Sequence, residues 1–189
     1  HFVTWPLLKA HAAVHGPLAL VHYDAHPDTW FDDGKRIDHG SFVARAVRDS
    51  VIEPEWSIQI GIRTNAPEDF GIRILYGHEL EEMRISDIVY AIRERTAGRK
   101  AYLTFDIDCL DPAFAPGTGT PVAGGPSSAR MLSVLRGLGD LDIAGADVVE
   151  VAPAYDHADI TAIAGASVAM HYLGLLAERK AKRAASTEA

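Results

Sequence analysis

The sequence predicts an α/β protein in which a mainly parallel sheet carries helices on both faces. Short apolar runs of strand length alternate along the chain with longer segments whose apolar residues have helical spacing. This alternation is typical of parallel strands joined by helical crossovers, because such strands become buried on both faces. A chain of 189 residues is long enough for one sizeable core. We therefore expect a single domain over residues 1–189.

Two helices and two strands are predicted in the first part of the chain. Residues 2–13 place apolar side chains on one side of a helix. Residues 18–23 form an apolar run between a Gly-Pro pair and an Asp-rich stretch, which suits a strand buried on both faces. Residues 41–50 resemble a short helix, and residues 57–62 alternate as a strand does.

Three helices and two strands are predicted in the remainder. Residues 86–97 have helical spacing, and residues 100–105 form a second buried strand. Residues 127–137 form the next predicted helix, and residues 143–149 form a third buried strand. Residues 160–183 are the closing helix. The order of strand then helix is therefore repeated along the chain, as the predicted fold class requires.

The two ends of the chain carry separate expectations. The first residue is His1, and a predicted helix follows at once, so we expect the chain to be the C-terminal part of a longer domain. The end is rich in Ala, Lys and Glu, and we expect it to fray from about residue 180.

Composition restricts the classes of partner. The chain has 18 Lys and Arg residues against 26 Asp and Glu residues, a formal charge of -8 that disfavours nucleic acid and suits a cationic small molecule. The single cysteine, Cys109, cannot form an internal disulfide, which favours a reducing compartment. No apolar run approaches the roughly 18 residues of a membrane helix, and no signal-peptide pattern opens the chain. We expect a cytoplasmic protein without a membrane partner.

Acidic residues follow the predicted buried strands. Asp24, His26 and Asp28 come directly after one strand, and an extended backbone would point these alternate side chains to the same side. Asp106 and Asp108 repeat the arrangement after a second strand. Open α/β sheets bind ligands beyond the carboxyl ends of their strands. The sequence therefore predicts a functional site at this edge, to which Glu150 after the third strand also belongs.

Four converging carboxylates indicate metal ions. Without cations they would repel one another and raise their own pKa values, whereas two divalent ions would cancel their formal charge. Oxygen-rich ligands with imidazole and no thiolate favour Mn²⁺ over Mg²⁺, Co²⁺ or Fe²⁺, and match structural zinc poorly. We predict a site for two Mn²⁺ ions, with Co²⁺ or Fe²⁺ as the alternatives.

Each motif also has a purely structural interpretation. The segment from Asp24 to Asp28 could provide turn and capping interactions, Glu150 could cap the following segment, and His39 could be an ordinary loop residue. Six further histidines lack a pattern and are expected on the surface or in packing roles: His11, His15, His22, His78, His157 and His171.

Two apparent motifs are rejected. Cys109 is expected to face away from the side that Asp108 uses, which argues against a nucleophile. Residues 116–121 superficially resemble a phosphate loop, but no Lys follows in the Walker position and Pro replaces a needed amide donor. We expect a rigid loop that lines the site.

Long segments around these residues resemble the manganese-dependent ureohydrolases, the family that includes arginase and agmatinase. The matching stretches are DAHPDT from Asp24, TFDIDCLDPAFAPGTGTPVAGG from Thr104 and DVVEVAPAYDHADITA from Asp147, within a similarity that runs from His1 to about Ala177. The resemblance implies a three-layer α/β/α, arginase-like fold, assembly as a homo-oligomeric trimer or hexamer, and cleavage of guanidino compounds to urea and an amine.

The resemblance also implies residue roles. His1 matches the histidine that ends the family's G-G-D-H motif, and the upstream segment that supplies the first strands and part of the pocket is missing. The implied metal ligands are His1, Asp24, His26, Asp28, Asp106 and Asp108, of which Asp24 and Asp108 match the bridging positions. His39 resembles the proton shuttle, Glu150 the carboxylate that holds the substrate guanidinium, and Thr120 a residue that lines the site.

The loop before His39 favours agmatine as the substrate. It lacks the Ser-Gly-Asn type loop of arginases and resembles the Asp-His-Gly form of agmatinases. The expected reaction cleaves agmatine to putrescine and urea through a hydroxide that bridges two ions roughly 3.5 Å apart. Alternatives remain: a guanidinobutyrate or guanidinopropionate hydrolase in which Lys35 or Arg36 contacts a substrate carboxylate, a phosphoesterase, or a non-catalytic metal-binding homologue.

Overall fold

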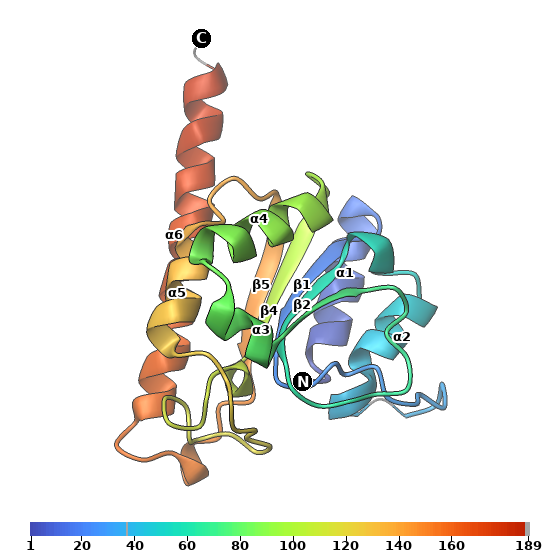
Figure 1. Cartoon of the computed structure of the whole chain (residues 1–189). Helices are drawn as coiled ribbons and strands as arrows, with labels where there is room; N and C mark the ends of the chain where they lie inside the picture. Colours follow the sequence, from blue (N-terminus) through green and yellow to red (C-terminus); the bar gives the residue numbers. More distant parts are fainter. Residues whose placement is uncertain (37, 188–189) are drawn as a thin grey trace.

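Five parallel strands form the centre of the computed structural model, which describes residues 1–36 and 38–187 (Figure 1). Their order across the sheet is β3-β2-β1-β4-β5. Their bounds are β1, Ala19–Tyr23; β2, Ile58–Ile62; β3, Arg73–Tyr76; β4, Ala101–Asp106; and β5, Ile143–Val149. All four strand pairings are parallel. The predicted fold class is therefore confirmed.

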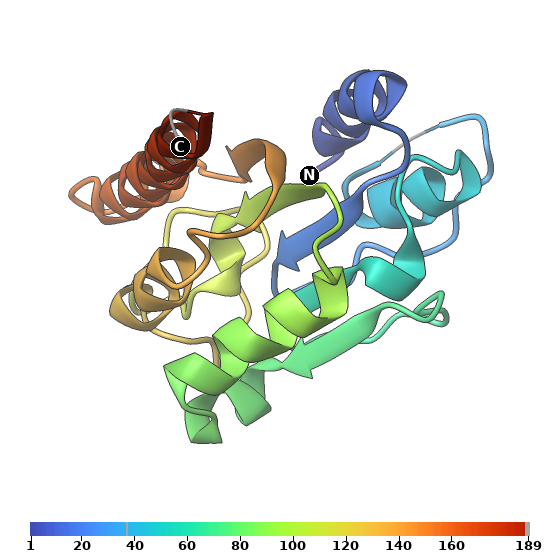
Figure 2. The ribbon, with the colours of Figure 1, turned by 90° about the horizontal axis from the view of Figure 1, so that it is seen from above.

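Helices cover both faces of this sheet, as Figure 2 shows. Helices α1 (Thr4–His15) and α2 (Phe42–Arg48) lie on one face, and α4 (Ile85–Thr96) and α5 (Ser128–Arg136) lie on the other. The long helix α6 (Ile160–Thr187) packs on α5 and β5, and its buried side chains join the core of the α4 and α5 face. The molecule thus has three layers.

Alternating side chains of the strands supply the two cores. Every residue of β1, β2 and β4 is buried. Leu20 and Tyr102 pack with α1 and α2, whereas Val21, Leu103 and Phe105 pack with the helices of the opposite face. This is why the strands read as continuous apolar runs in the sequence.

Two elements were not predicted from the sequence. Strand β3 has only four residues and is half exposed, so it shows no continuous apolar run. Helix α3 (Gly77–Glu82) begins at a glycine and has six residues, too few to display a helical period. Both follow β2 at the edge of the sheet farthest from β5.

The last helix is longer than predicted. Helix α6 continues to Thr187, beyond the predicted end at residue 183, and the expected fraying from about residue 180 stays a prediction. Ala, Lys, Glu and Arg dominate this end, and all four are strong helix formers. The last two residues of the predicted tail lie outside the described residues.

The expectation that no segment could cross a membrane is also wrong on length and composition. Within α6, the segment Ile160–Lys182 is long and apolar enough to cross a membrane. Its Ala residues, together with scattered Ile, Val and Leu residues, raise the mean hydropathy without forming an obvious apolar run. One such helix is weak evidence of a membrane span, because core helices meet the same criterion, and Val168, Tyr172 and Leu175 of α6 are buried in the core.

Candidate metal centre

Three neighbouring strands end at the same edge of the sheet. Asp24 follows β1, Asp106 is the last residue of β4, and Glu150 follows β5. The register pairs Tyr23 with Phe105 and Asp106 with Val149, so the three ends lie side by side. The sequence-based prediction of an acidic edge beyond the strands is therefore confirmed.

The local backbone differs from the predicted extended conformation. The Asp24 Oδ1 atom accepts a hydrogen bond from the His26 amide at 2.6 Å, and the Asp106 Oδ1 atom accepts one from the Asp108 amide at 2.9 Å. Asp28 has a left-handed backbone with φ of 51°, which Asp tolerates better than most residues. Turns held by the carboxylates themselves, rather than strand alternation, bring these side chains together.

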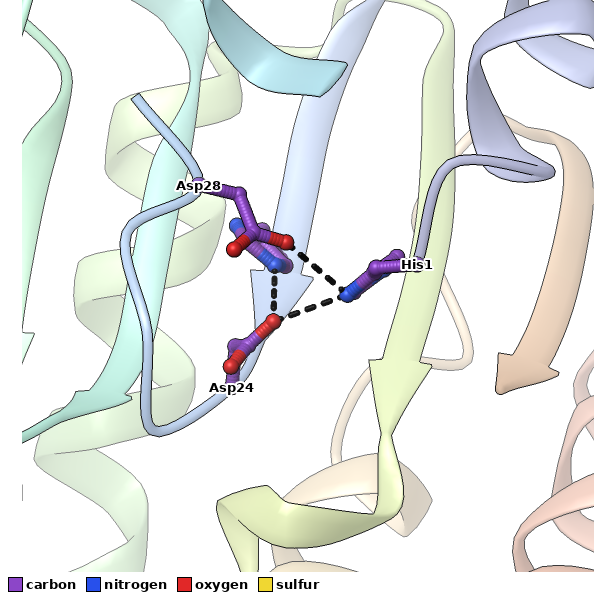
Figure 3. A group of neighbouring side chains, drawn as sticks. His1, Asp24 and Asp28 are labelled. Atoms are coloured by element: carbon purple, nitrogen blue, oxygen red, sulfur yellow. Dashed lines mark hydrogen bonds and ion pairs between the residues drawn. The ribbon is translucent and has the colours of Figure 1, made fainter. Parts of the chain in front are cut away.

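Two imidazoles face the carboxylates. His1 Nδ1 lies 2.8 Å from Asp24 Oδ2, 3.2 Å from Asp28 Oδ2 and 3.1 Å from Asp106 Oδ2. Figure 3 shows His1, at the start of the chain, pointing toward Asp24 and Asp28, which both lie in the segment that follows β1.

The second imidazole forms a second group. His26 Nδ1 lies 3.3 Å from Asp24 Oδ1 and 3.1 Å from Asp108 Oδ2. Asp24 therefore contributes one oxygen to each of two adjacent groups of metal-ligand type. This arrangement suits a carboxylate that bridges two ions, and the bridging roles of Asp24 and Asp108 both stay predictions.

The carboxylates are buried and electrostatically strained. Burial, together with the negative charge of Asp24, raises the pKa of Asp28 to about 8. The same two causes raise the pKa of Asp106 well above its usual value. The pKa of Asp24 is lowered, because the neighbouring imidazoles outweigh the opposing effect of burial. Several negative charges thus compete for one water-excluded space.

The pKa values of the two histidines are also raised. Burial lowers the pKa of His26, but Asp108 and Asp24 raise it more, to about 10. Burial also lowers the pKa of His1, but its hydrogen bonds to Asp106, Asp24 and Asp28 raise it well above the usual value. Without cations, protons supply the positive charge that this group of carboxylates requires.

The residues fit a pair of divalent cations. The donor set contains four carboxylates and two imidazole nitrogens, and the buried Asp28 Oδ2 atom, 3.2 Å from His1 Nδ1, makes no well-aligned hydrogen bond among the described residues. Oxygen-rich sets of this kind suit Mn²⁺ and related hard or borderline ions. Cations could replace the protons that the strained carboxylates and histidines hold.

A cavity of about 410 Å³ opens above these groups. His39, Thr120 and Glu150 line it together with most of the metal-ligand candidates, and Trp30 and Gly119 contribute further wall. The structure therefore brings all nine predicted site residues to one place. It also places the predicted site-lining loop there, through Gly119 and Thr120.

Glu150 and His39 form a pair at the rim of the cavity. The His39 Nδ1 atom lies 2.8 Å from Glu150 Oε1, and 64% of the His39 side chain is exposed to solvent. Glu150 has a left-handed backbone with φ of 64°, an unusual conformation for a non-glycine residue. Such backbone strain is often found at functional sites. The third residue, Thr120, donates a hydrogen bond to Asp108 Oδ2 at 3.3 Å.

Sequence reasoning missed two buried polar residues that contact the ligand candidates. His22 was expected on the surface or in packing, but it is fully buried in β1 with Nε2 2.8 Å from Asp24 Oδ2. Thr104 Oγ1 lies 2.7 Å from His1 Nε2 and donates to Asp147 Oδ1 at 2.5 Å. Each is a polar side chain inside a predicted buried strand, where it needs a partner. That was the signal in the sequence.

The Thr104 contact orients His1. Because the Thr104 hydroxyl donates its proton to Asp147, its oxygen accepts from His1 Nε2–H. The other ring nitrogen, Nδ1, then faces the three carboxylates with the lone pair that a metal ligand needs once the ring is neutral.

Comparison with known proteins places the chain in a family. The sequence model described as the Arginase family matches residues 1–174. The chain belongs to the arginase family. An agmatinase from Neisseria meningitidis serogroup C is 52% identical over 180 residues, which cover 95% of this chain and 58% of that protein. This chain therefore spans a little over half the length of such arginase-family relatives.

Solved structures of the arginase family share the fold. A hypothetical agmatinase from Burkholderia thailandensis superimposes with a TM-score of 0.94 at 54% identity, covering 96% of this chain and 58% of that one. The proclavaminate amidino hydrolase of Streptomyces clavuligerus superimposes with a TM-score of 0.90 at 41% identity, covering 95% of this chain and 62% of that one. The arginase-like fold implied by the sequence motifs is confirmed.

Proposed function

We propose that the full-length protein containing this chain is a binuclear-metal hydrolase that cleaves agmatine to putrescine and urea. One observation carries the proposal: two carboxylate and imidazole groups that share Asp24 lie beneath a cavity whose rim presents Glu150 and His39. The relatives named agmatinase, at 52% identity, support the choice of reaction.

The proposed metal ligands are the six residues identified above. Asp24, Asp28 and Asp106 surround His1 Nδ1, and Asp24 and Asp108 surround His26 Nδ1. When bound, two divalent cations activate water for attack on the guanidinium carbon. We propose Mn²⁺ as the resident ion, with Co²⁺ or Fe²⁺ as alternatives, because the donors are mainly oxygen.

The rim residues act on the substrate itself. The Glu150 carboxylate accepts hydrogen bonds from the planar, permanently charged guanidinium and orients its carbon toward the carboxylate floor of the cavity. His39 is exposed at the mouth of the cavity and lies within hydrogen-bond distance of Glu150, so it can deliver a proton to the departing amine. Thr120 positions Asp108 and lines the wall.

The cavity favours a substrate without a carboxylate. Among the described residues that line it there is no Lys or Arg. Lys35 and Arg36 are exposed, and neither lines the cavity. Their backbone amides donate to Asp33. This supports agmatine over arginine and guanidino acids, and it argues against a phosphoesterase, whose transition state needs cationic clamps.

A guanidino acid hydrolase is the second candidate. The likeness to an amidino hydrolase named for a different substrate, proclavaminate, shows that this fold is compatible with other substrates. Residues outside this chain could supply a contact to a substrate carboxylate.

The setting of the reaction is also part of the proposal. We place residues 1–189 in a single ureohydrolase domain of a cytoplasmic homo-oligomer, a trimer or a hexamer, that acts on a small cationic guanidino compound. The acidic composition and the buried, unpaired Cys109 support this setting.

The deciding experiment measures urea release by the Mn²⁺-loaded, full-length protein. We expect turnover of agmatine and little of arginine, 4-guanidinobutyrate or 3-guanidinopropionate, and we expect Asp106→Asn to abolish it. Preference for a guanidino acid would transfer the proposal to the second candidate. A folded, metal-loaded protein that releases no urea from any of the four compounds would refute hydrolase function and favour a non-catalytic homologue.

A further inference from the structure

We infer that His22 is a positioning residue for Asp24, a neutral imidazole whose Nε2–H is directed at the carboxylate by Gln59, and that it is not a metal ligand. The inference rests on the proposed metal centre, in which Asp24 serves both ions. It concerns two side chains for which the sequence analysis assigned no role at the site.

His22 and Gln59 form a buried contact between two adjacent strands. They are register partners in the pairing of β1 with β2, and both are fully buried. The Gln59 Nε2 atom lies 3.0 Å from His22 Nδ1 and 2.6 Å from the backbone oxygen of Pro27. On the opposite side of the imidazole, His22 Nε2 lies 2.8 Å from Asp24 Oδ2.

These contacts define which atoms of the Gln59 amide and the His22 ring donate and which accept. The Pro27 carbonyl can only accept, so the atom of Gln59 that faces it must be the amide nitrogen. The same nitrogen donates its second hydrogen to His22 Nδ1, which must therefore be unprotonated. A neutral imidazole carries its hydrogen on the remaining nitrogen, Nε2, which then donates to Asp24 Oδ2.

The same logic excludes His22 as a ligand. By distance alone, His22 belongs to a group with His1, Asp24 and Asp28 that could hold an ion. Metal binding through Nε2 would move the hydrogen to Nδ1, where it would meet the Gln59 amide, a second donor. Rotating the amide would instead place its oxygen against the Pro27 oxygen. The first arrangement would oppose two N–H donors and the second would oppose two oxygen acceptors, both in a buried space.

The unused atom of Gln59 agrees with this assignment. Its Oε1 atom is buried and has no hydrogen-bond partner among the described residues. The amide therefore uses both of its hydrogens and leaves its oxygen without a partner. The unsatisfied oxygen costs stability, whereas the two donated bonds fix the orientation of the amide.

The consequence concerns the orientation of Asp24. Its Oδ2 atom receives the His22 hydrogen, and its Oδ1 atom receives the backbone amide of His26 at 2.6 Å. One fixed donor on each oxygen holds the carboxylate plane and leaves the remaining lone pairs for cations. Because Asp24 is shared by both groups of ligands, an error in its orientation would affect both ions.

The test compares Mn²⁺ binding by variants of the full-length protein. His22→Leu removes the donor, and we expect its Mn²⁺ affinity, measured by isothermal titration calorimetry, to fall about 10- to 100-fold. His22→Gln can present an amide N–H near the former Nε2 position and should restore most of the affinity while still binding two ions. Tyr23→Phe is the matched control, because it removes a buried hydroxyl without a hydrogen-bond partner from the next residue of β1.

Two results would overturn the inference. One is wild-type Mn²⁺ affinity in His22→Leu, and the other is the loss of one bound ion in His22→Gln, as expected if His22 were a ligand. If His22→Leu does not fold, Gln59→Leu replaces it, with weaker binding supporting the inference and wild-type affinity refuting it. Urea release is measured separately, so a protein that binds Mn²⁺ as described but hydrolyses no guanidino compound would refute the proposed reaction alone.

Discussion

Asp24 contacts histidines of the candidate metal centre through both of its carboxylate oxygens. It is buried, it faces His1 and His22 with one oxygen and His26 with the other, and its charge raises the pKa values of Asp28 and Asp106. Metal-ligand candidates and substrate-facing residues should therefore respond differently to substitution, since only the former include the buried carboxylates whose charge cations or protons must balance.

The first residue-scale prediction separates substrate binding from metal binding. Glu150→Gln keeps the size of the side chain but removes the charge that pairs with the guanidinium. We expect kcat/KM for agmatine to fall by about 10- to 100-fold, the cost of a charged hydrogen bond, with two Mn²⁺ ions still bound. Steady-state kinetics and metal analysis of the same preparation check this. Loss of an ion would show instead that Glu150 belongs to the metal centre.

The second concerns proton delivery. His39→Ala should lower kcat by about 100-fold or more, because a positioned general acid is lost, and should change KM little. His39 is largely exposed, so the melting temperature should stay near that of the wild type. An unchanged kcat would remove His39 from the proposed mechanism.

At the scale of elements, the ends of strands bring the site together. Strand β2 has a register irregularity between Ile60 and Ile62, and Gly61 between them has φ of +100°. A Cβ atom at Gly61 would lie 2.8 Å from Cys109 Sγ and 3.1 Å from the Asp24 backbone oxygen. Only glycine lets β2 approach the end of β1 and the turn after β4 so closely.

Gly61→Ala is therefore expected to destabilise the protein by about 1–3 kcal/mol through overpacking and backbone strain. Gly174→Ala is the matched control, because that glycine lies within α6 and a Cβ atom there meets nothing within 4 Å. The control should stabilise by up to about 1 kcal/mol. Denaturant unfolding of both variants tests the pair, and equal effects would contradict the role of the β2 irregularity.

At the scale of the whole molecule, the candidate metal centre couples folding to pH. In the folded, metal-free protein the pKa of Asp28 is raised to about 8 and that of His26 to about 10. The folded state therefore keeps protons that the unfolded chain releases at lower pH, and folded-state stability must fall as pH rises through this range. Divalent ions would take the place of those protons.

We therefore expect the melting temperature of the chelator-treated, full-length protein to fall between about pH 5 and pH 8. Added Mn²⁺ should raise the melting temperature more at pH 8 than at pH 6, because fewer protons then compete for the ligands. Scanning calorimetry with and without Mn²⁺ checks both statements. A metal-free melting temperature that rises over this interval would contradict the assigned charge balance.

The sequence by itself determined the fold class and the candidate ligands. Apolar runs such as residues 18–23 nearly coincide with their strand, because burial on both faces leaves a continuous apolar signal. Residues 143–149, predicted as a buried strand, form the edge strand β5, whose five central residues are only half-buried. Acidic residues at the ends of those runs, together with the family motifs, identified nine candidate residues. Eight of them line one cavity, and the ninth, Asp24, contacts His1 and His26 beside it.

Only the tertiary structure decided how those residues are held. Gln59 meets His22 across 37 positions of sequence, and Thr104 meets Asp147 across 43, so both contacts depend on the register of parallel strands. Periodicity reports which face a side chain occupies, but it does not say which residue of the next strand stands opposite. The direction of the hydrogen bonds around His22, and with it the tautomer of that imidazole, follows from this register together with the Pro27 carbonyl in the loop after β1.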